Sequence, residues 1–177
     1  MWGFRSEYLT GLFISRNIPL EEAMFFICIP YACVFTYFVI KEYFPNINEL
    51  FKSRVFIFIL ITLSLILFLF NLEKMYTSYT FGLLSFVLFY CLYRRININT
   101  ITISFISILP FILISNGLLT GMYIENEVVW YNDLHNLGFR IFTIPFEDFF
   151  YGYLLILLNV LLYEAFKNFN FTNFIKR

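Results

Sequence analysis

The sequence predicts an all-α membrane protein, a polytopic transmembrane helical bundle with about five spanning helices in one domain over residues 1–177. Hydrophobic residues make up 60% of the chain and charged residues 14%, whereas soluble domains carry about 25% charged residues. So little charge cannot cover a water-soluble particle of this size, and lipid is therefore the expected solvent. In lipid, the backbone polar groups must be satisfied within helices.

The expected helices are apolar runs that approach the roughly 20 residues needed to cross a bilayer. In chain order they cover residues 20–40, 54–71, 75–93, 99–115 and 145–166. The connections at 71–74 and 94–97 are tight, which predicts that the helices they join form antiparallel hairpins. The connection at 116–143 is long, polar and aromatic, which favours an ordered, functional loop near the lipid headgroups.

The distribution of Lys and Arg predicts the orientation in the membrane. One side would carry Arg5, Arg16, Lys74 and Arg140. The other side would carry Lys41, Lys52, Arg54, Arg94, Arg95, Lys167, Lys176 and Arg177. Because cytoplasmic loops carry the excess of positive residues, we expect an integral protein of the cytoplasmic (inner) membrane, with the N-terminus outside and the C-terminus in the cytoplasm.

Composition argues against several classes of partner. The net charge is zero, so no nucleic acid is expected to bind. His135 is the only histidine, and Cys28, Cys33 and Cys91 are scattered through apolar runs. Zinc and haem sites need clustered ligands of these types, so no metal is expected.

One motif occurs twice in the chain. Tyr-Leu-Thr-Gly at residues 8–11 is followed by Ile-Pro-Leu-Glu-Glu at 18–22, and Leu-Leu-Thr-Gly at 118–121 is followed by Ile-Pro-Phe-Glu-Asp at 144–148. Both copies are expected at the same membrane face, because the first and fifth helices should run the same way. The repeat divides the chain into a first motif with its helix, a three-helix middle and a second motif with its helix, at residues 1–53, 54–115 and 116–177.

The repeat places two adjacent acids in the first turn of the first and of the fifth predicted helix. They are Glu21, Glu22, Glu147 and Asp148. Each pair alone fits helix capping as well as function, because proline and acids both suit a first helical turn. Two acids at the mouth of a membrane helix, twice, favour function, because carboxyl groups in membrane segments are costly. Neighbouring helix positions point about 100° apart, so one acid of each pair could cap while the other faces the interior. A protonated carboxyl beside an ionised one could add protons to a hydrocarbon and remove them, and aromatic rings could stabilise the cation between the two steps.

Several stretches carry a family resemblance, and they are residues 8–11, 19–22, 29–37, 116–121 and 138–152. In sequence and in order they resemble the lycopene cyclase domain of the heterodimeric and archaeal type, a membrane family that includes the cyclase half of fungal bifunctional phytoene synthases. The resemblance runs from Trp2 to Glu164.

The resemblance implies a reaction in carotenoid biosynthesis. A ψ-end of lycopene, or of a related acyclic carotenoid, is protonated, the chain closes on the carbocation, and loss of a ring proton leaves a β-ionone ring without net redox change. This makes the enzyme an isomerase-type intramolecular lyase. The catalytic candidates carried over by motif are Glu21, Glu22, Glu147 and Asp148. At this stage either role, acid or base, is open to each of them, as are the choice of β or ε ring and the number of ends cyclised. The chain lacks the Gly-x-Gly-x-x-Gly of flavin-dependent cyclases, so no cofactor is expected.

Further residues are expected to bind the substrate or support the acids, and they are Arg140, Asn116, Tyr151, Phe25 and Tyr131. Arg140 is expected to pair with Glu147, Asp148 or Glu21, with an anchor at the membrane interface as the alternative. Trp2 and Trp130 fit an interfacial aromatic belt.

Members of the family generally carry two more spanning helices ahead of the Trp-Gly-Phe segment, and this chain begins inside that segment. Residues 5–7 also depart from the Asn-Pro-x of the family. These departures favour an alternative, a non-catalytic or partner-dependent subunit of a split carotenoid cyclase that works with a second cyclase chain or as a homo-oligomer. A proton-coupled transporter fits less well, because the second to fourth predicted spans hold almost no ionisable residues.

Overall fold

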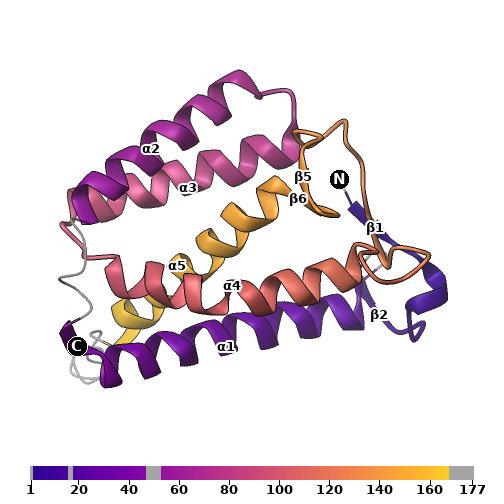
Figure 1. The fold of residues 1–177 in the computed structure, drawn as a ribbon, viewed down its shortest axis with the longest axis horizontal. Helices are drawn as coiled ribbons and strands as arrows, with labels where there is room; N and C mark the ends of the chain where they lie inside the picture. The colour runs from indigo at the N-terminus through magenta and orange to yellow at the C-terminus, as the bar shows by residue number, and fades with distance from the viewer. Residues whose placement is uncertain (1, 16–17, 47–52, 168–177) are drawn as a thin grey trace, which may run out of the picture.

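The protein is mostly helical, in agreement with the predicted fold class. The computed structural model describes residues 2–15, 18–46 and 53–167. Within them, every predicted helix is present: α1 (Leu20–Tyr43), α2 (Ser53–Phe70), α3 (Met75–Tyr93), α4 (Asn99–Leu119) and α5 (Phe146–Lys167) (Figure 1).

The helices α1, α3, α4 and α5 are long and apolar enough to cross a membrane. The apolar stretch of α2, Arg54–Phe70, is shorter. Pro30 and Pro110 lie inside α1 and α4, where membrane helices tolerate proline more readily than soluble helices do. Four such helices fit an integral membrane protein.

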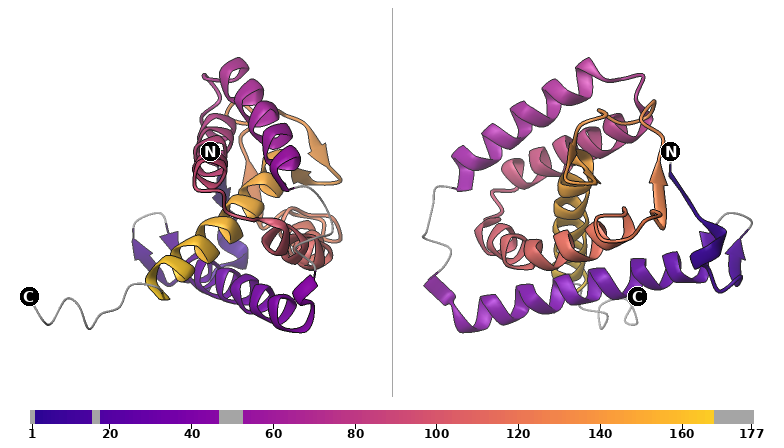
Figure 2. Two further views of the ribbon diagram at one scale, coloured as in Figure 1. Left: turned by 90° about the vertical axis from the view of Figure 1, so that its left-hand side faces the viewer. Right: turned by 45° about the vertical axis from the view of Figure 1, so that its right-hand side comes forward.

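The helices form two pairs that are joined by α5. Helix α2 lies against α3, α1 lies against α4, and α5 contacts α3, α1 and α4 (Figures 1 and 2). The residues Ile156, Leu157 and Val160 of α5 are almost completely buried. Helix α5 is therefore the central element of the bundle.

Only one of the two tight connections forms the predicted antiparallel hairpin. The connection after α2 produces the antiparallel pair predicted for residues 71–74, whereas α3 and α4 diverge and α4 packs mainly against α1 and α5. Helix α3 ends in a left-handed turn, in which Arg95 has a φ of 55° and the Ile96 N–H donates to the Cys91 carbonyl at 2.9 Å. The turn reverses the chain, but the apolar faces of α1 and α5 decide where α4 packs.

Short antiparallel strand pairs cover one end of the bundle. They are β1 (Trp2–Phe4) with β4 (Val129–Tyr131), β2 (Phe13–Ser15) with β3 (Ile18–Pro19), and β5 (Arg140–Ile141) with β6 (Ile144–Pro145). Figure 1 places them where α1 and α5 begin. The expected loop at 116–143 is ordered, although it starts later than predicted because α4 continues to Leu119.

Candidate functional site

Helices α1 and α5 both begin directly after a two-stranded hairpin, and the hairpins close in the same way. The N–H of the first helical residue donates back to a carbonyl ahead of the hairpin. Leu20 donates to Leu12 at 2.9 Å, and Phe146 donates to Phe139 at 3.1 Å. The Ile-Pro segments of the repeat thus form the second strand of each hairpin, β3 and β6.

The first acid of each pair holds its own hairpin. One oxygen of Glu21, Oε1, accepts the Thr10 N–H at 2.7 Å. In the same way, Glu147 Oε1 accepts the Leu137 N–H at 2.6 Å. A carboxylate in the first turn of a helix also interacts favourably with the helix dipole. One acid of each pair therefore binds the segment ahead of its helix, and in α1 no side-chain hydrogen bond caps the helix itself.

The glycines of the two copies align differently from the sequence repeat. Gly11 has a φ of 81° and Gly138 has a φ of 73°, and each follows the residue whose N–H binds the first acid. The sequence repeat paired Gly11 with Gly121, but Gly121 (φ 90°) ends α4, next to the Met122 N–H that donates to the Gly117 carbonyl. The first copy is one residue longer between its glycine and its acids, and the register of β2 and β3 is irregular at that point.

Glu147 is fully buried and ties three elements together. Its Oε1 also accepts the Thr77 hydroxyl of α3 at 2.6 Å, while no partner is found for Oε2 among the described residues. The carboxyl thus links α5, the segment before β5 and the start of α3. Glu147 does not line the cavity described next.

A mostly apolar cavity of about 460 Å³ lies between the two copies of the motif. This volume is within the range of about 300–1,000 Å³ that is typical of ligand sites. Seven of the predicted site residues line it: Glu21, Glu22, Phe25, Asn116, Tyr131, Asp148 and Tyr151. Glu147 and Arg140 lie outside it. In the part of the chain that the structure describes, no group of His, Cys, Asp and Glu could hold a metal ion.

The second acid of each pair faces this cavity, and its neighbours differ between the copies. Asp148 is 6% exposed and accepts two phenolic hydrogen bonds, from Tyr76 to Oδ1 at 2.5 Å and from Tyr131 to Oδ2 at 2.9 Å. Glu22 is half-buried and accepts the indole N–H of Trp2 on Oε1 at 3.2 Å. Hydrogen bonds to a carboxylate are roughly twice as strong as neutral ones. Because Asp148 accepts two of them and Glu22 accepts one longer bond, Asp148 is held more firmly.

The surroundings of Tyr131 keep its phenol protonated, so that it can donate a hydrogen bond. Burial, and after it the charge of the neighbouring Asp148, raises the pKa of Tyr131 well above its ordinary value. The phenol therefore stays protonated at any physiological pH. The register of β1 and β4, which pairs Trp2 with Tyr131, brings this side chain and the Trp2 indole to the same cavity wall.

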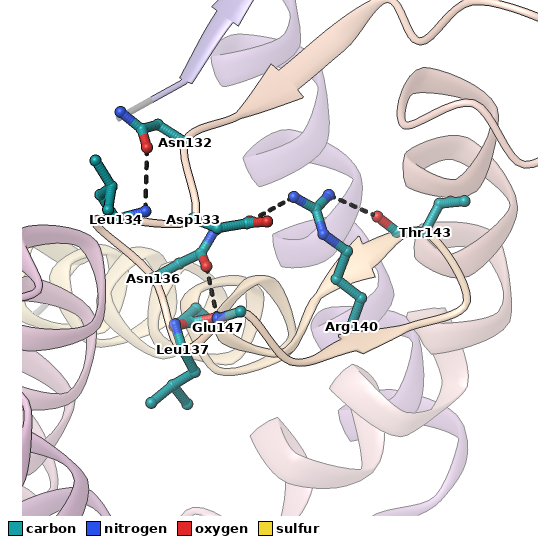
Figure 3. Close-up of polar contacts among 9 residues, drawn as sticks. Asn132, Asp133, Leu134, Asn136, Leu137, Arg140, Thr143 and Glu147 are labelled. Carbon is teal, nitrogen blue, oxygen red and sulfur yellow. Dashed lines mark hydrogen bonds and ion pairs between the residues drawn. The ribbon is translucent and has the colours of Figure 1, made fainter.

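Arg140 does not pair with any of the four acids, so that prediction is wrong. Its guanidinium donates to Asp133 Oδ1 at 2.6 Å and to the Thr143 carbonyl at 3.3 Å, and lies 6.0 Å from the centre of the Tyr131 ring. Figure 3 shows the guanidinium between Asp133 and Thr143, away from Glu147. The hydrogen bond from Arg140 lowers the pKa of Asp133. Arg140 lies in β5, and an acid of its own loop is in closer reach than the helix mouth.

Sequence reasoning missed three residues that contact the acids. Tyr76 and Thr77 open α3 and reach Asp148 and Glu147, although they are far from both motifs in the sequence. The available signal was the run of five hydroxyl-bearing residues at 76–80, at the start of the helix. Trp2 was interpreted as an interfacial residue, but it lines the cavity and donates to Glu22.

Comparison with known proteins adds one match. A family model described as lycopene cyclase matches residues 1–40 and 73–166, which is more than half of the chain. The matched residues include both hairpins and all four acids, while the stretch at 41–72, which contains α2, lies outside the match. No curated protein and no solved structure matches the chain.

Proposed function

Because the chain belongs to the lycopene cyclase family, we propose that it closes the acyclic ψ-ends of lycopene into β-ionone rings by acid–base catalysis. The observation that carries this proposal is the placement of Glu22 and Asp148. They occupy equivalent positions in two copies of one motif and line the same apolar cavity. The reaction would make the protein an isomerase-type intramolecular lyase of carotenoid biosynthesis that acts without a cofactor.

The proposed reaction needs only proton transfers. An acid adds a proton to the terminal double bond of the substrate, which forms a C–H bond and leaves a carbocation. The electron pair of a second double bond then forms the C–C bond that closes the ring, and the charge moves to a ring carbon. A base removes a proton from a neighbouring carbon, and the C–H electron pair becomes the ring double bond. One proton enters and one leaves, so the product is an isomer of the substrate.

The hydrogen bonds support an assignment of the two roles. Both oxygens of Asp148 accept phenolic protons, which favours the ionised carboxylate that a base requires. Among the described residues, Glu22 accepts one longer indole hydrogen bond, on Oε1, so Oε2 is the atom that would carry the proton. We assign Glu22 as the acid and Asp148 as the base, while Glu21 and Glu147 act by holding the two hairpins in place.

Activity in cells that accumulate lycopene tests this function. The full chain should convert lycopene into cyclic carotenoids, which are separated and identified by their absorption spectra. Asp148→Asn and Glu22→Gln should each lower the conversion by about 10²–10⁴-fold, the usual contribution of a general acid or base. The protein should remain in the membrane in both variants.

Glu164→Gln is a matched control, because Glu164 lies in α5 but pairs with Lys41 at 2.6 Å, outside the cavity. Lycopene should disappear in this variant as in the wild type. If lycopene persists with the wild-type chain while another member of the family converts it under the same conditions, the chain is not a self-sufficient cyclase.

The alternative is a partner-dependent or non-catalytic subunit of a split cyclase. It is supported by the position of Trp2. Trp2 lies in the cavity wall, so a segment supplied by a second chain or a second copy could complete the cavity there. Conversion of lycopene only when the chain is co-expressed with a second cyclase chain would favour this alternative.

We also propose that the cavity opens toward the outer face of the cytoplasmic membrane. The helix directions support a common face for both motifs, because α1 and α5 begin at the same end of the bundle (Figure 1). Arg16, Lys52, Lys176 and Arg177, which contributed to the predicted orientation, lie outside the described residues. Labelling of an introduced cysteine at Leu134, which is exposed beside the site, by a membrane-impermeant reagent on intact cells would support this orientation. Labelling only after lysis would contradict it.

A further inference from the structure

Four aromatic side chains form a cluster against Asp148, with Tyr76 at its centre. The Tyr76 ring lies 5.9 Å from the Trp2 indole, 6.1 Å from the Tyr131 ring and 6.3 Å from the Tyr151 ring. All four residues line the cavity. They come from β1, α3, β4 and α5, so the cluster exists only when these elements are packed together.

Tyr76 also connects this cluster to the carboxyl group proposed as the base. Its phenol is the closer of the two donors to Asp148, at 2.5 Å against 2.9 Å for Tyr131. The side chains of Tyr76 and Asp148 are both buried, at 9% and 6% exposure. Because Tyr76 and Tyr131 bind different oxygens of the carboxylate, together they fix the direction in which it points.

The substrate supplies little that could orient it. A hydrocarbon end group has no hydrogen-bonding atoms, so only the shape of the cavity and the positions of fixed charges can determine how it lies. After ring closure, several carbons next to the cationic carbon carry protons, and loss of a proton from each gives a different position of the double bond. The product isomer therefore depends on where the base is held relative to the cation.

We propose that Tyr76 is the positioning residue that decides which proton Asp148 removes, by orienting the carboxylate with its phenol and the cationic ring with its aromatic face. This inference rests on the proposed function and deepens it. Aromatic faces attract a cation, and the cluster gathers four rings at the cavity, two of which bind the carboxylate through their phenols. The cation is thus held near the base in one orientation, and one double-bond isomer results.

Two substitutions separate the roles of the ring and the phenol. Tyr76→Phe keeps the ring and removes the donor to Asp148. Tyr76→Leu removes both. Tyr79→Phe is the matched control, because Tyr79 lies on the same helix, is 60% exposed and does not line the cavity. The full chain is used in each case, in lycopene-accumulating cells and in isolated membranes.

Tyr76→Phe should lower kcat roughly tenfold, with a smaller change in KM, because the loss acts on the transition state. The main readout is the composition of the product, in which isomers with other ring double bonds should appear beside the wild-type isomer. Tyr76→Leu should lower kcat by about 10² or more and give the broadest mixture. Tyr79→Phe should leave both the rate and the isomer unchanged.

The composition of the product does not depend on how much of a variant folds, since each product molecule comes from an active enzyme. Tyr131→Phe provides a second test on a residue outside the spanning helices, and it should also broaden the mixture. A single unchanged isomer in Tyr76→Phe and Tyr131→Phe would overturn the inference, even if turnover fell, because Tyr76 would then act on rate or stability alone. In that case, cyclic products from the wild type would leave the proposed function intact. A wild-type chain without cyclic products would overturn both.

Discussion

The two copies of the hairpin–helix motif share their hydrogen bonds but lie in different surroundings. In each copy the first acid accepts a backbone N–H from the residue before a left-handed glycine. The second acid of each copy reaches the common cavity. These shared features are local, because each is set by a short stretch in which a glycine is followed by an Ile-Pro-x-Glu segment.

The surroundings follow from the helix to which each copy belongs. Helix α5 is central, so its copy is enclosed. Ile144 is 1% exposed and Glu147 is fully buried. Helix α1 lies at the edge of the bundle (Figure 2), and the equivalent Ile18 is 43% exposed. The copy that precedes α5 is therefore the enclosed copy, and the copy that precedes α1 is the outer copy.

The difference shows how a repeat can supply two chemical roles. The enclosed copy meets α3 and β4, and their phenols hold Asp148 from both sides. In the outer copy, β1 supplies the Trp2 indole, which binds Glu22 through one longer hydrogen bond. One motif thus yields a fixed carboxylate and a less constrained carboxyl. Acid–base catalysis needs two groups whose environments differ in this way.

The largest loss of stability is expected when the first acid of the enclosed copy, Glu147, is replaced. Glu147→Ala leaves the Leu137 N–H and the Thr77 hydroxyl without their acceptor in a buried place, and it removes packed volume. We expect a loss of about 3–5 kcal/mol in the free energy of unfolding, as when one partner of a buried polar network is removed. Thermal unfolding followed by circular dichroism in detergent measures this.

Glu147→Gln, which keeps the shape and one acceptor oxygen, is the matched control and should lose less stability. Glu21→Ala, the equivalent change in the outer copy, should also lose less, because its carboxyl is more accessible to water. Equal destabilisation by Glu21→Ala and Glu147→Ala would mean that the two copies do not differ in the way the packing indicates.

The second prediction concerns the strand pair that brings Trp2 to the acid of the outer copy. Gly3 lies under the Trp130 indole, and a Cβ atom at this position would lie 2.6 Å from the ring. Gly3→Ala should therefore disturb the pairing of β1 with β4, at a cost of about 1–3 kcal/mol for overpacking. Trp2 would leave Glu22, while the Tyr76 hydrogen bond to Asp148 would remain.

Fluorescence reports this change directly, because Trp2 and Trp130 are the only tryptophans of the chain and both lie in the disturbed pair. Emission should move to longer wavelength and become easier to quench with iodide. Gly152→Ala is the control, since its added methyl would meet Phe105 at an ordinary 3.5 Å. An unchanged spectrum in Gly3→Ala would show that the indole yields without loss of the strand pair.

The helices were predictable from the sequence because each depends on a continuous apolar run. The segment 75–93 was predicted to the residue, and the others differ by a few residues at their ends. Packing between helices was not predictable in the same way. The turn at Arg95 suggested a hairpin, but whether α4 returns along α3 depends on which apolar faces fit each other, and hydropathy alone does not record this.

The acids of the site were predictable because the repeat marks them, whereas their neighbours were not. Tyr76 lies 72 positions from Asp148 in the sequence, and only the packing of α3 against α5 brings the two together. Arg140 illustrates the opposite error. It is close in sequence to the helix mouth and opposite in charge to its acids, yet Asp133 binds it first. The alignment of Gly121 with Gly11 failed for a similar reason, because a glycine after a helix and a glycine before a hairpin can look alike in a short motif.

The third prediction tests whether Gly11 and Gly138 are equivalent positions in the two copies. Gly11 and Gly138 have positive φ, and no atom lies within 4 Å of a Cβ added at either position. Alanine at each site should therefore cost about 1 kcal/mol through backbone strain alone, and the loss should be nearly equal despite the different burial of the two copies. Unfolding of the two variants under identical conditions tests this.

Asparagine tolerates this conformation better than alanine does, so Gly11→Asn and Gly138→Asn should recover part of the loss. A neutral Gly138→Ala beside a destabilising Gly11→Ala would contradict the structural alignment of the copies.

The smallest expected effect concerns the ion pair beside the enclosed copy. Arg140 and Asp133 have side chains that are 31% and 57% exposed, so a double-mutant cycle with Arg140→Ala and Asp133→Ala should give a coupling of only about 0.2–1 kcal/mol. The coupling should shrink as salt is added, because exposed charges are screened. The pair between Arg5 and Glu127 near the outer copy is longer, at 3.3 Å, and about equally exposed, and its coupling should be smaller still.

Activity distinguishes this arrangement from the pairing that the sequence suggested. If Arg140 neutralised Asp148 or Glu147, Arg140→Ala would leave a buried charge uncompensated and turnover would collapse. Because Arg140 binds Asp133 directly and none of the four acids, we expect Arg140→Ala to keep most of its turnover, and Asp133→Ala to behave in the same way. A loss of turnover in Arg140→Ala comparable to that of Asp148→Asn would place the guanidinium in the charge balance of the cavity, and the two copies would then differ by a cation as well as by their phenols.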